Sequence, residues 1–170
     1  MEIDERDHLF RPRQLVIDLG AAPGSWSQYA ASRIGAGGKV VAVDVLPMEP
    51  IRNVEFIQGD FGDADVHRRC LGALSDRRAD LVISDMAPNL SGVRATDQAR
   101  SMRLAELALE FAEEVLAPRG DLLLKLFQGS GADEFRKELV KHFQRVIVRK
   151  PGASKSASRE FYVLARGRKV

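Results

Sequence analysis

The chain has 170 residues, of which 45% are hydrophobic and 29% charged, and its net charge is only +2. This length and composition are typical of one globular domain with a real core, not of a disordered or fibrous chain. No membrane-spanning apolar run and no signal peptide can be recognised, so we expect a cytoplasmic protein with no membrane partner. The single Cys70 excludes an internal disulfide, and three scattered histidines predict no metal site.

The predicted elements alternate between strands and helices. We predict strands at 15–19, 39–44, 54–57, 81–85, 121–127, 146–149 and 161–166, and helices at 25–34, 65–74, 97–116 and 133–143. Residues 1–14 are polar and could contain the end of another helix, and Pro118 with Gly120 should end the longest one. This alternation indicates an α/β fold with a mostly parallel sheet covered by helices on both faces. The last two strands have no helix between them, so they should form an antiparallel hairpin at one edge.

A glycine-rich stretch over residues 16–26 reads Val-Ile-Asp-Leu-Gly-Ala-Ala-Pro-Gly-Ser-Trp, which indicates a buried strand, a tight turn and a helix N-terminus. Gly20 and Gly24 permit positive φ and let a ligand approach the backbone closely. The stretch is neither a Walker A loop nor a GxGxxG motif, because its spacing is Gly-x-x-Pro-Gly. It resembles the first motif of methyltransferases that use S-adenosylmethionine (SAM), with a purely structural turn as the alternative.

Acids follow the predicted strands at the edge where doubly wound sheets bind ligands. Asp44 ends the second strand, where a carboxylate can accept hydrogen bonds from both ribose hydroxyls of a nucleoside. Asp60 is placed to meet the adenine amino group, or is simply a turn acid. Asp85 should lie between cofactor and substrate, with a loop acid as the alternative. Trp26, the only tryptophan, could form a wall of the cofactor site or pack on the core.

Lys125 is unusual because it lies within the apolar strand Leu122–Phe127. A buried ammonium costs several kcal/mol unless it is paired, so we expect a partner close by. The alternative is a lysine that extends from the strand end to solvent. Glu160 precedes the last strand and could return toward Lys125.

The C-terminal quarter is basic. Against the single Glu160 it carries Arg145, Arg149, Lys150, Lys155, Arg159, Arg166, Arg168 and Lys169. Such a segment is either a footprint for RNA phosphates or a solvated edge. On the first interpretation, Lys150, Lys155 and Arg159 should contact phosphates from the loop before the last strand.

Four motifs together resemble the FtsJ/RrmJ family of ribosomal RNA 2′-O-methyltransferases. They are Asp-Leu-Gly-Ala-Ala-Pro-Gly-Ser-Trp-Ser-Gln (18–28), Ser-Asp-Met-Ala-Pro-Asn-Leu-Ser-Gly (84–92), Leu-Leu-Leu-Lys-Leu-Phe-Gln-Gly (122–129) and Lys-Pro-Gly-Ala-Ser-Lys-Ser-Ala-Ser-Arg-Glu-Phe-Tyr (150–162). The resemblance implies a Rossmann-like SAM-dependent methyltransferase fold with a seven-stranded sheet, formed by a single domain over residues 1–170. It implies SAM contacts at Gly24, Trp26, Asp44, Asp60 and Asp85. It also implies a catalytic Lys-Asp-Lys-Glu set, in which Asp85, Lys125 and Glu160 match the last three members.

The resemblance further implies methyl transfer from SAM to the ribose 2′-hydroxyl of a uridine in large-subunit ribosomal RNA. We expect a monomer that acts on this RNA, with Lys125, steered by Asp85 and Glu160, orienting and deprotonating the hydroxyl. The first family lysine would lie just upstream of Glu2, so we expect the chain to be truncated at its start. The missing lysine leaves open a non-catalytic protein that binds SAM or RNA. A separate alternative is a 2′-O-methyltransferase that acts on tRNA.

Overall fold

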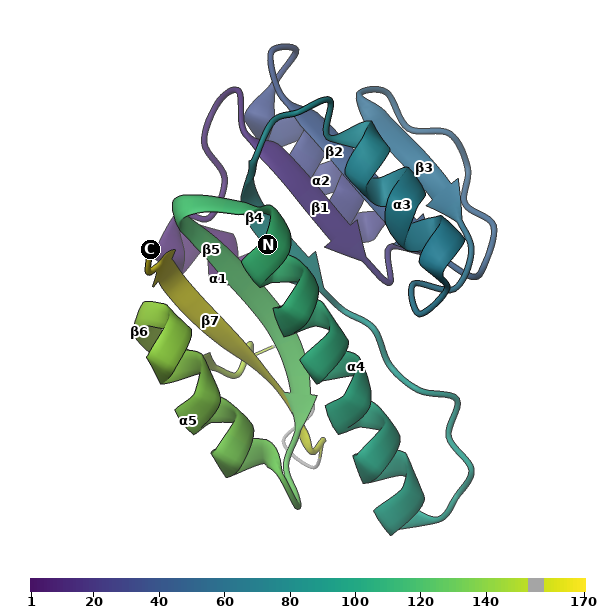
Figure 1. Ribbon diagram of the computed structural model, residues 1–170, viewed down its shortest axis with the longest axis vertical. Coiled ribbons are helices and arrows are strands. Elements are labelled where there is room, and N and C mark those ends of the chain that lie inside the picture. The colour runs from purple at the N-terminus through teal and green to yellow at the C-terminus, as the bar shows by residue number, and fades with distance from the viewer. Residues whose placement is uncertain (153–157) are drawn as a thin grey trace.

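The computed structural model describes residues 1–152 and 158–170. Its helices are α1 (Glu2–Asp7), α2 (Ser25–Ile34), α3 (Ala64–Ala73), α4 (Arg94–Val115) and α5 (Ala132–His142). Its strands are β1 (Leu15–Leu19), β2 (Lys39–Asp44), β3 (Val54–Gln58), β4 (Ala79–Ser84), β5 (Leu116–Phe127), β6 (Phe143–Arg149) and β7 (Glu160–Arg168). The described strands form one seven-stranded sheet in the order β3-β2-β1-β4-β5-β7-β6 (Figure 1).

The sheet is parallel except at β7. Strand β1 pairs in parallel with β2 and β4, and β4 pairs in parallel with β5. Strand β7 is antiparallel to both β5 and β6, so the predicted hairpin is confirmed. Because β7 inserts between β5 and β6, the edge strand is β6, and the last strand of the chain lies beside the strand that carries Lys125.

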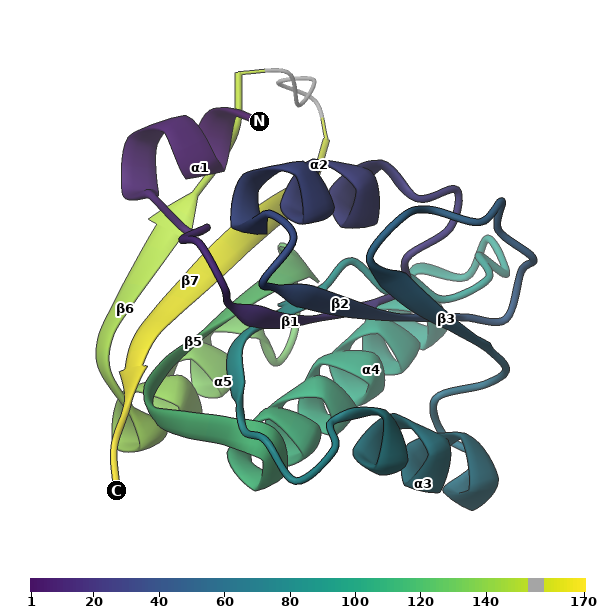
Figure 2. The same ribbon diagram turned by 90° about the horizontal axis from the view of Figure 1, so that it is seen from above.

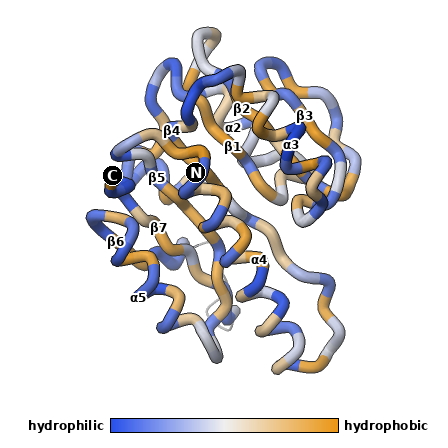
Figure 3. Tube along the Cα trace, in the orientation of Figure 1, coloured by the Kyte–Doolittle hydropathy of each residue, from blue (hydrophilic) through white to orange (hydrophobic). Residues whose placement is uncertain are grey.

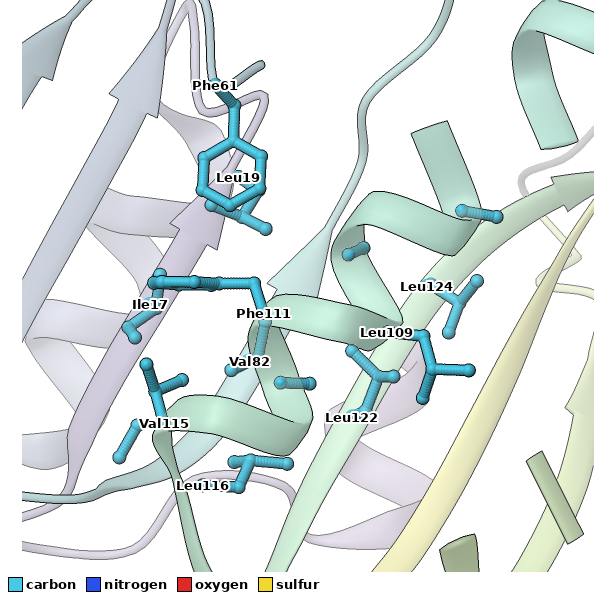
Figure 4. Close-up of a cluster of buried hydrophobic side chains, with 14 of the residues drawn as sticks. Ile17, Leu19, Phe61, Val82, Leu109, Phe111, Val115, Leu116, Leu122 and Leu124 are labelled. Atoms are coloured by element: carbon cyan, nitrogen blue, oxygen red, sulfur yellow. The ribbon is translucent and has the colours of Figure 1, made fainter. Parts of the chain in front are cut away.

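Helices cover both faces of the sheet, as predicted. Helices α1 and α2 lie on one face, and α3, α4 and α5 lie on the other (Figure 2). Apolar residues are concentrated along the strands, whereas the helices alternate between apolar and polar positions (Figure 3). On the α4 face, the fully buried Phe111 packs edge-on against Phe61, with ring centroids 4.9 Å apart, above Ile17 and Val82 (Figure 4). Burying such aromatic and branched side chains contributes about 1.5–3 kcal/mol each.

The predicted C-terminal ends of two helices are wrong. Helix α4 ends at Val115, and β5 already begins at Leu116, which is fully buried and pairs with Ala79. Pro118 and Gly120 therefore do not end the helix but lie in β5, where the register with β4 shifts. Likewise Phe143 does not end α5 but starts β6, because its ring is buried against the sheet. In both cases burial of a large side chain outweighs the local helical pattern.

Smaller differences affect other element ends. Strand β4 ends at Ser84, so Asp85 is the first residue beyond the strand and not its last residue. Its backbone N–H still donates to Leu19 O at 3.0 Å, which holds the start of the following loop against β1. The polar N-terminal segment, in which the sequence left room for a further helix, contains the short helix α1. No helix within residues 1–152 and 158–170 is both long and apolar enough to cross a membrane.

Candidate active site

The glycine-rich turn between β1 and α2 lies at the carboxyl edge of the sheet. Gly20 has φ 75°, and a Cβ added to it would lie 2.8 Å from the backbone nitrogen of Met86. Gly24, with φ 120°, is the residue that precedes α2. Only glycine fits position 20 without moving the backbone of the β4–α4 loop, so the turn and that loop pack directly against each other.

Asp44 fixes this turn from the end of β2. One carboxylate oxygen accepts the N–H of Ala22 at 2.9 Å, and the other accepts the N–H of Leu46 at 2.9 Å. Asp60 is exposed and accepts the N–H of Gly62 at 2.8 Å, which is a turn-forming contact. Each carboxylate oxygen has a second lone pair, so both acids keep acceptor capacity toward a ligand. Their roles in cofactor binding remain predictions.

Asp18 is a buried acid that the sequence analysis did not single out. It lies in the middle of β1 with no solvent exposure, and its Oδ2 accepts the hydroxyl of Ser27 at 2.6 Å. Among the described residues, Oδ1 has no hydrogen-bond partner. Burial raises the pKa of Asp18 to about 7, and the nearby Asp85 and Asp44 carboxylates add to the rise. An acid inside an otherwise apolar strand was the available signal.

Lys125, Asp85 and Tyr162 form a cluster beside the turn. The Lys125 side chain is 11% exposed, and its ammonium nitrogen lies 3.3 Å from Asp85 Oδ1. The Tyr162 hydroxyl donates to the same oxygen at 2.9 Å. Tyr162 is directly opposite Lys125 in the β5–β7 pairing, so both side chains lie on one face of the sheet. Burial and the Asp85 charge raise the pKa of Tyr162, so its hydroxyl stays protonated.

Glu160 precedes Tyr162 on β7 and has no ion pair with Lys125 among the described residues. It is opposite Phe127 in the register, two residues before Tyr162 on the same face of β7. Its charge nevertheless contributes to the raised pKa of Tyr162. Tyr162 itself was quoted only as part of a motif in the sequence, because nothing local shows that it faces Lys125.

Trp26 connects this cluster to the N-terminal segment. The ring is partly buried, and its centroid lies 6.4 Å from that of Phe10 and 6.4 Å from that of Tyr162. The core-packing interpretation therefore describes the ring as it stands, and its use as a wall of the cofactor site remains a prediction.

Within the part of the chain that the structure describes, some of the cations in the basic C-terminal segment are paired with acids of the fold, and others are not. Arg149 forms a bidentate pair with Asp7, with both nitrogen to oxygen distances at 2.8 Å, and anchors α1 to β6. Arg166 binds Asp121 at 3.2 Å and the Asp7 carbonyl at 2.6 Å. These two arginines hold the fold together, which neither of our interpretations of the segment anticipated.

The predicted RNA contacts lie around the β6–β7 connection. Lys150 is exposed and donates to the Ser158 and Glu160 carbonyls at 2.6 and 2.9 Å, and Arg159 donates to the Gln128 carbonyl. Lys155 lies outside the described residues. Within residues 1–152 and 158–170, no group of three or more metal-ligating side chains comes together.

Comparison with known proteins gives one consistent family. The family model described as FtsJ-like methyltransferase matches residues 1–168. Ribosomal RNA large subunit methyltransferase E of Alkalilimnicola ehrlichii is 56% identical over 167 residues, covering 98% of this chain and 80% of the relative. The protein of the same name from Cellvibrio japonicus is 52% identical over 167 residues, covering 98% of this chain and 79% of the relative.

Solved structures share the architecture. The crystal structure of a protein from Plasmodium falciparum that is named a ribosomal RNA methyltransferase has a TM-score of 0.86 and 27% identity. The match covers 98% of this chain and 93% of that one. The structure of human Methyltransferase-like protein 13 in complex with SAH has a TM-score of 0.64 and 16% identity, covering 91% of this chain and 71% of that one. At this identity the likeness shows the fold alone. The family match over almost the whole chain, the relatives above half identity and the Rossmann-like sheet agree, and the chain belongs to the FtsJ-like methyltransferase family.

Proposed function

We propose that this chain transfers a methyl group from SAM to the ribose 2′-hydroxyl of a uridine in large-subunit ribosomal RNA. The observation that carries the proposal is the mostly buried pair of Lys125 and Asp85, 3.3 Å apart beside a glycine-rich turn. Such a pair at the carboxyl edge of a doubly wound sheet is suited to orient a hydroxyl group next to a bound nucleoside. The names of the relatives support large-subunit RNA as the substrate.

The residues of the turn fit SAM. SAM carries a positive sulfonium and a positive ammonium group, and the carboxylates of Asp44 and Asp85 both lie close enough to Asp18 to raise its pKa. The unpaired oxygen of Asp18 would gain from a cation nearby, because an uncompensated buried charge is costly. Gly20 and Gly24 would let the methionine part of SAM lie against the backbone, and Asp44 would hold its ribose. When bound, SAM supplies an electrophilic methyl group.

The cluster of Lys125, Asp85 and Tyr162 has separable tasks in this proposal. The Tyr162 hydroxyl, held in its protonated form, donates to Asp85 Oδ1 and fixes the carboxylate. Asp85 in turn positions the Lys125 ammonium, which orients the 2′-oxygen of the substrate. The Asp85 carboxylate then takes up the proton that the hydroxyl releases, because the Lys125 ammonium can only donate. Positioning two reactants in this way accounts for a large part of enzymatic rate enhancement.

RNA binding should use the cations near the β6–β7 connection. We propose that Lys150 and Arg159, together with Lys155, contact phosphates. Each lost phosphate contact should reduce the salt dependence of binding by roughly one unit of slope. Arg149 and Arg166 are excluded from this set because both are held by acids of the fold.

The experiment that tests the function uses large ribosomal subunits from cells that lack the gene. Subunits, naked ribosomal RNA and tRNA are each incubated with the purified protein and SAM carrying a labelled methyl group, and ribose methylation is mapped by resistance to alkaline cleavage. We expect a 2′-O-methyluridine in large-subunit RNA, lost in Lys125→Ala and retained in the exposed control Lys137→Ala. Label in tRNA alone, or on a base, would refute the assignment.

A further inference from the structure

A hollow of about 390 Å³ is lined by residues that closely follow Asp85 and Lys125 in the chain, among them Pro88 and Phe127. It is bounded by the β4–α4 loop, the first turns of α4, the end of β5 and the entry to β7. The residues on which the inference rests are Pro88, Leu90, Arg94, Gln98, Phe127 and Arg159. The volume falls in the range of about 300–1,000 Å³ that small-molecule sites occupy.

Hydrogen bonds fix two walls of this hollow against α4. The Asp97 carboxylate accepts the N–H and the hydroxyl of Ser91 at 2.8 and 2.7 Å and the N–H of Gly92 at 3.2 Å, which ties down the loop. Gln98, buried in α4, donates from its amide to the carbonyls of Phe127 and Ser130, both at 3.1 Å, which ties down the end of β5. The hollow is therefore a built feature of the chain.

The chemistry of the hollow is apolar on its walls and cationic at its rim. Pro88, Leu90 and the Phe127 ring supply flat or branched carbon surface, and Leu90 is 76% exposed although it is a large apolar side chain. Arg94 and Arg159 supply positive charge. The Asp97 carboxylate also borders the hollow, but both of its oxygens are already bound to the loop. A flat aromatic ring attached to anionic groups suits this combination, and a nucleobase with its flanking phosphates has that form.

The position of the hollow relates it to the reacting ribose. Phe127 follows Lys125 by two residues on β5, which is about 7 Å along an extended strand. Pro88 follows Asp85 by three residues in the loop. A substrate strand that presents one ribose to Lys125 therefore passes the hollow within one nucleotide.

We propose that this hollow binds a single unstacked base of the substrate RNA, within one nucleotide of the methylated ribose. The base packs between Leu90 and the Phe127 ring, and Arg94 and Arg159 meet the adjoining phosphates. The inference rests on the proposed function for the identity of the RNA. Its consequence is that the enzyme needs a flexible, unpaired segment as substrate, because a base within a duplex cannot enter the hollow.

The test compares two probes of equal length and charge, a fluorescent uridine pentanucleotide and the same ribose-phosphate chain without bases. The wild-type chain should bind the pentanucleotide roughly tenfold more tightly, because the stacking of one base on an aromatic ring contributes about that much to affinity. Leu90→Ser should remove most of this preference. The matched control is Val93→Ser, because Val93 is also an exposed apolar residue of the same loop, at 57%, but does not border the hollow.

Both serine variants remove surface carbon and should leave the fold intact, which circular dichroism checks. Equal affinity of the wild-type chain for the two probes would overturn the inference, as would equal losses in Leu90→Ser and Val93→Ser. The outcome is separable from that of the proposed function. Methyl transfer to large subunits without a preference for the pentanucleotide would refute only the base-binding role of the hollow. A preference for the pentanucleotide without 2′-O-methyl transfer would refute only the proposed function.

Discussion

Replacing Asp18 with asparagine should make the free protein more stable at neutral pH. In the folded chain burial raises the pKa of Asp18 from 3.8 to about 7. Between these two values the folded state binds one proton more than the unfolded state, so stability falls as the pH rises through this interval. At about 1.4 kcal/mol per pH unit, the loss is about 4 kcal/mol by pH 7. Asparagine can still accept from Ser27 but does not ionise.

The assay is urea denaturation at half-unit steps between pH 4 and pH 8, without SAM. The two proteins should have similar unfolding free energies near pH 4, and Asp18→Asn should gain steadily until about pH 7. Asp133→Asn is the matched control, because the Asp133 side chain is 79% exposed, and it should follow the wild-type curve. Parallel curves for the wild-type chain and Asp18→Asn over the whole range would refute this account of Asp18.

The same substitution should weaken SAM binding, because it removes the charge that, in the proposed site, stabilises the cations of the cofactor. Wild-type affinity should rise between pH 6 and pH 8 as Asp18 ionises, whereas that of Asp18→Asn should stay low and flat. Isothermal calorimetry in two buffers of different ionisation enthalpy would also detect the proton that the wild-type protein releases. A variant that binds SAM as tightly as the wild-type chain at pH 8 would show that Asp18 serves the fold alone.

Three further substitutions test other parts of the site. Tyr162→Phe removes the hydroxyl that donates to the Asp85 carboxylate, and such a hydrogen bond contributes about 1.5–3 kcal/mol. The kcat in steady-state assays should therefore fall by about tenfold to a hundredfold, with little change in KM for SAM. An unchanged kcat would argue against a role of Tyr162 in positioning Asp85. Gly20→Ala should lower the free energy of unfolding by about 1–3 kcal/mol in urea denaturation, because the new Cβ meets Met86 and the backbone has positive φ. The matched control is Gly72→Ala, which has open space around the added Cβ and should not destabilise α3. Asp44→Ala should weaken SAM by about 1–3 kcal/mol in calorimetry, and unchanged affinity would remove it from the cofactor site.

The fold class could be read from local sequence patterns alone, and the same patterns predict where the site lies. Apolar strand runs that alternate with helices predict a doubly wound sheet, and a glycine-rich turn after the first strand predicts where a nucleoside would bind, because both signals are local. The bounds of β1, β2 and α2 follow the prediction residue for residue. Lys125 was conspicuous for the same reason, since one cation within an apolar strand violates the pattern of its neighbours.

Which side chains face one another depends on how whole strands and helices pack. Tyr162 joins Lys125 and Asp85 because β7 inserts between β5 and β6 in one particular register, and register is set by the packing of whole strands and not by any short motif. The same holds for Arg149, whose charge looks available to RNA in the sequence but is taken up by Asp7, 142 residues earlier in the chain. Ionic and hydrogen-bond partners so far apart are brought together by the burial of the sheet, and no local pattern records them.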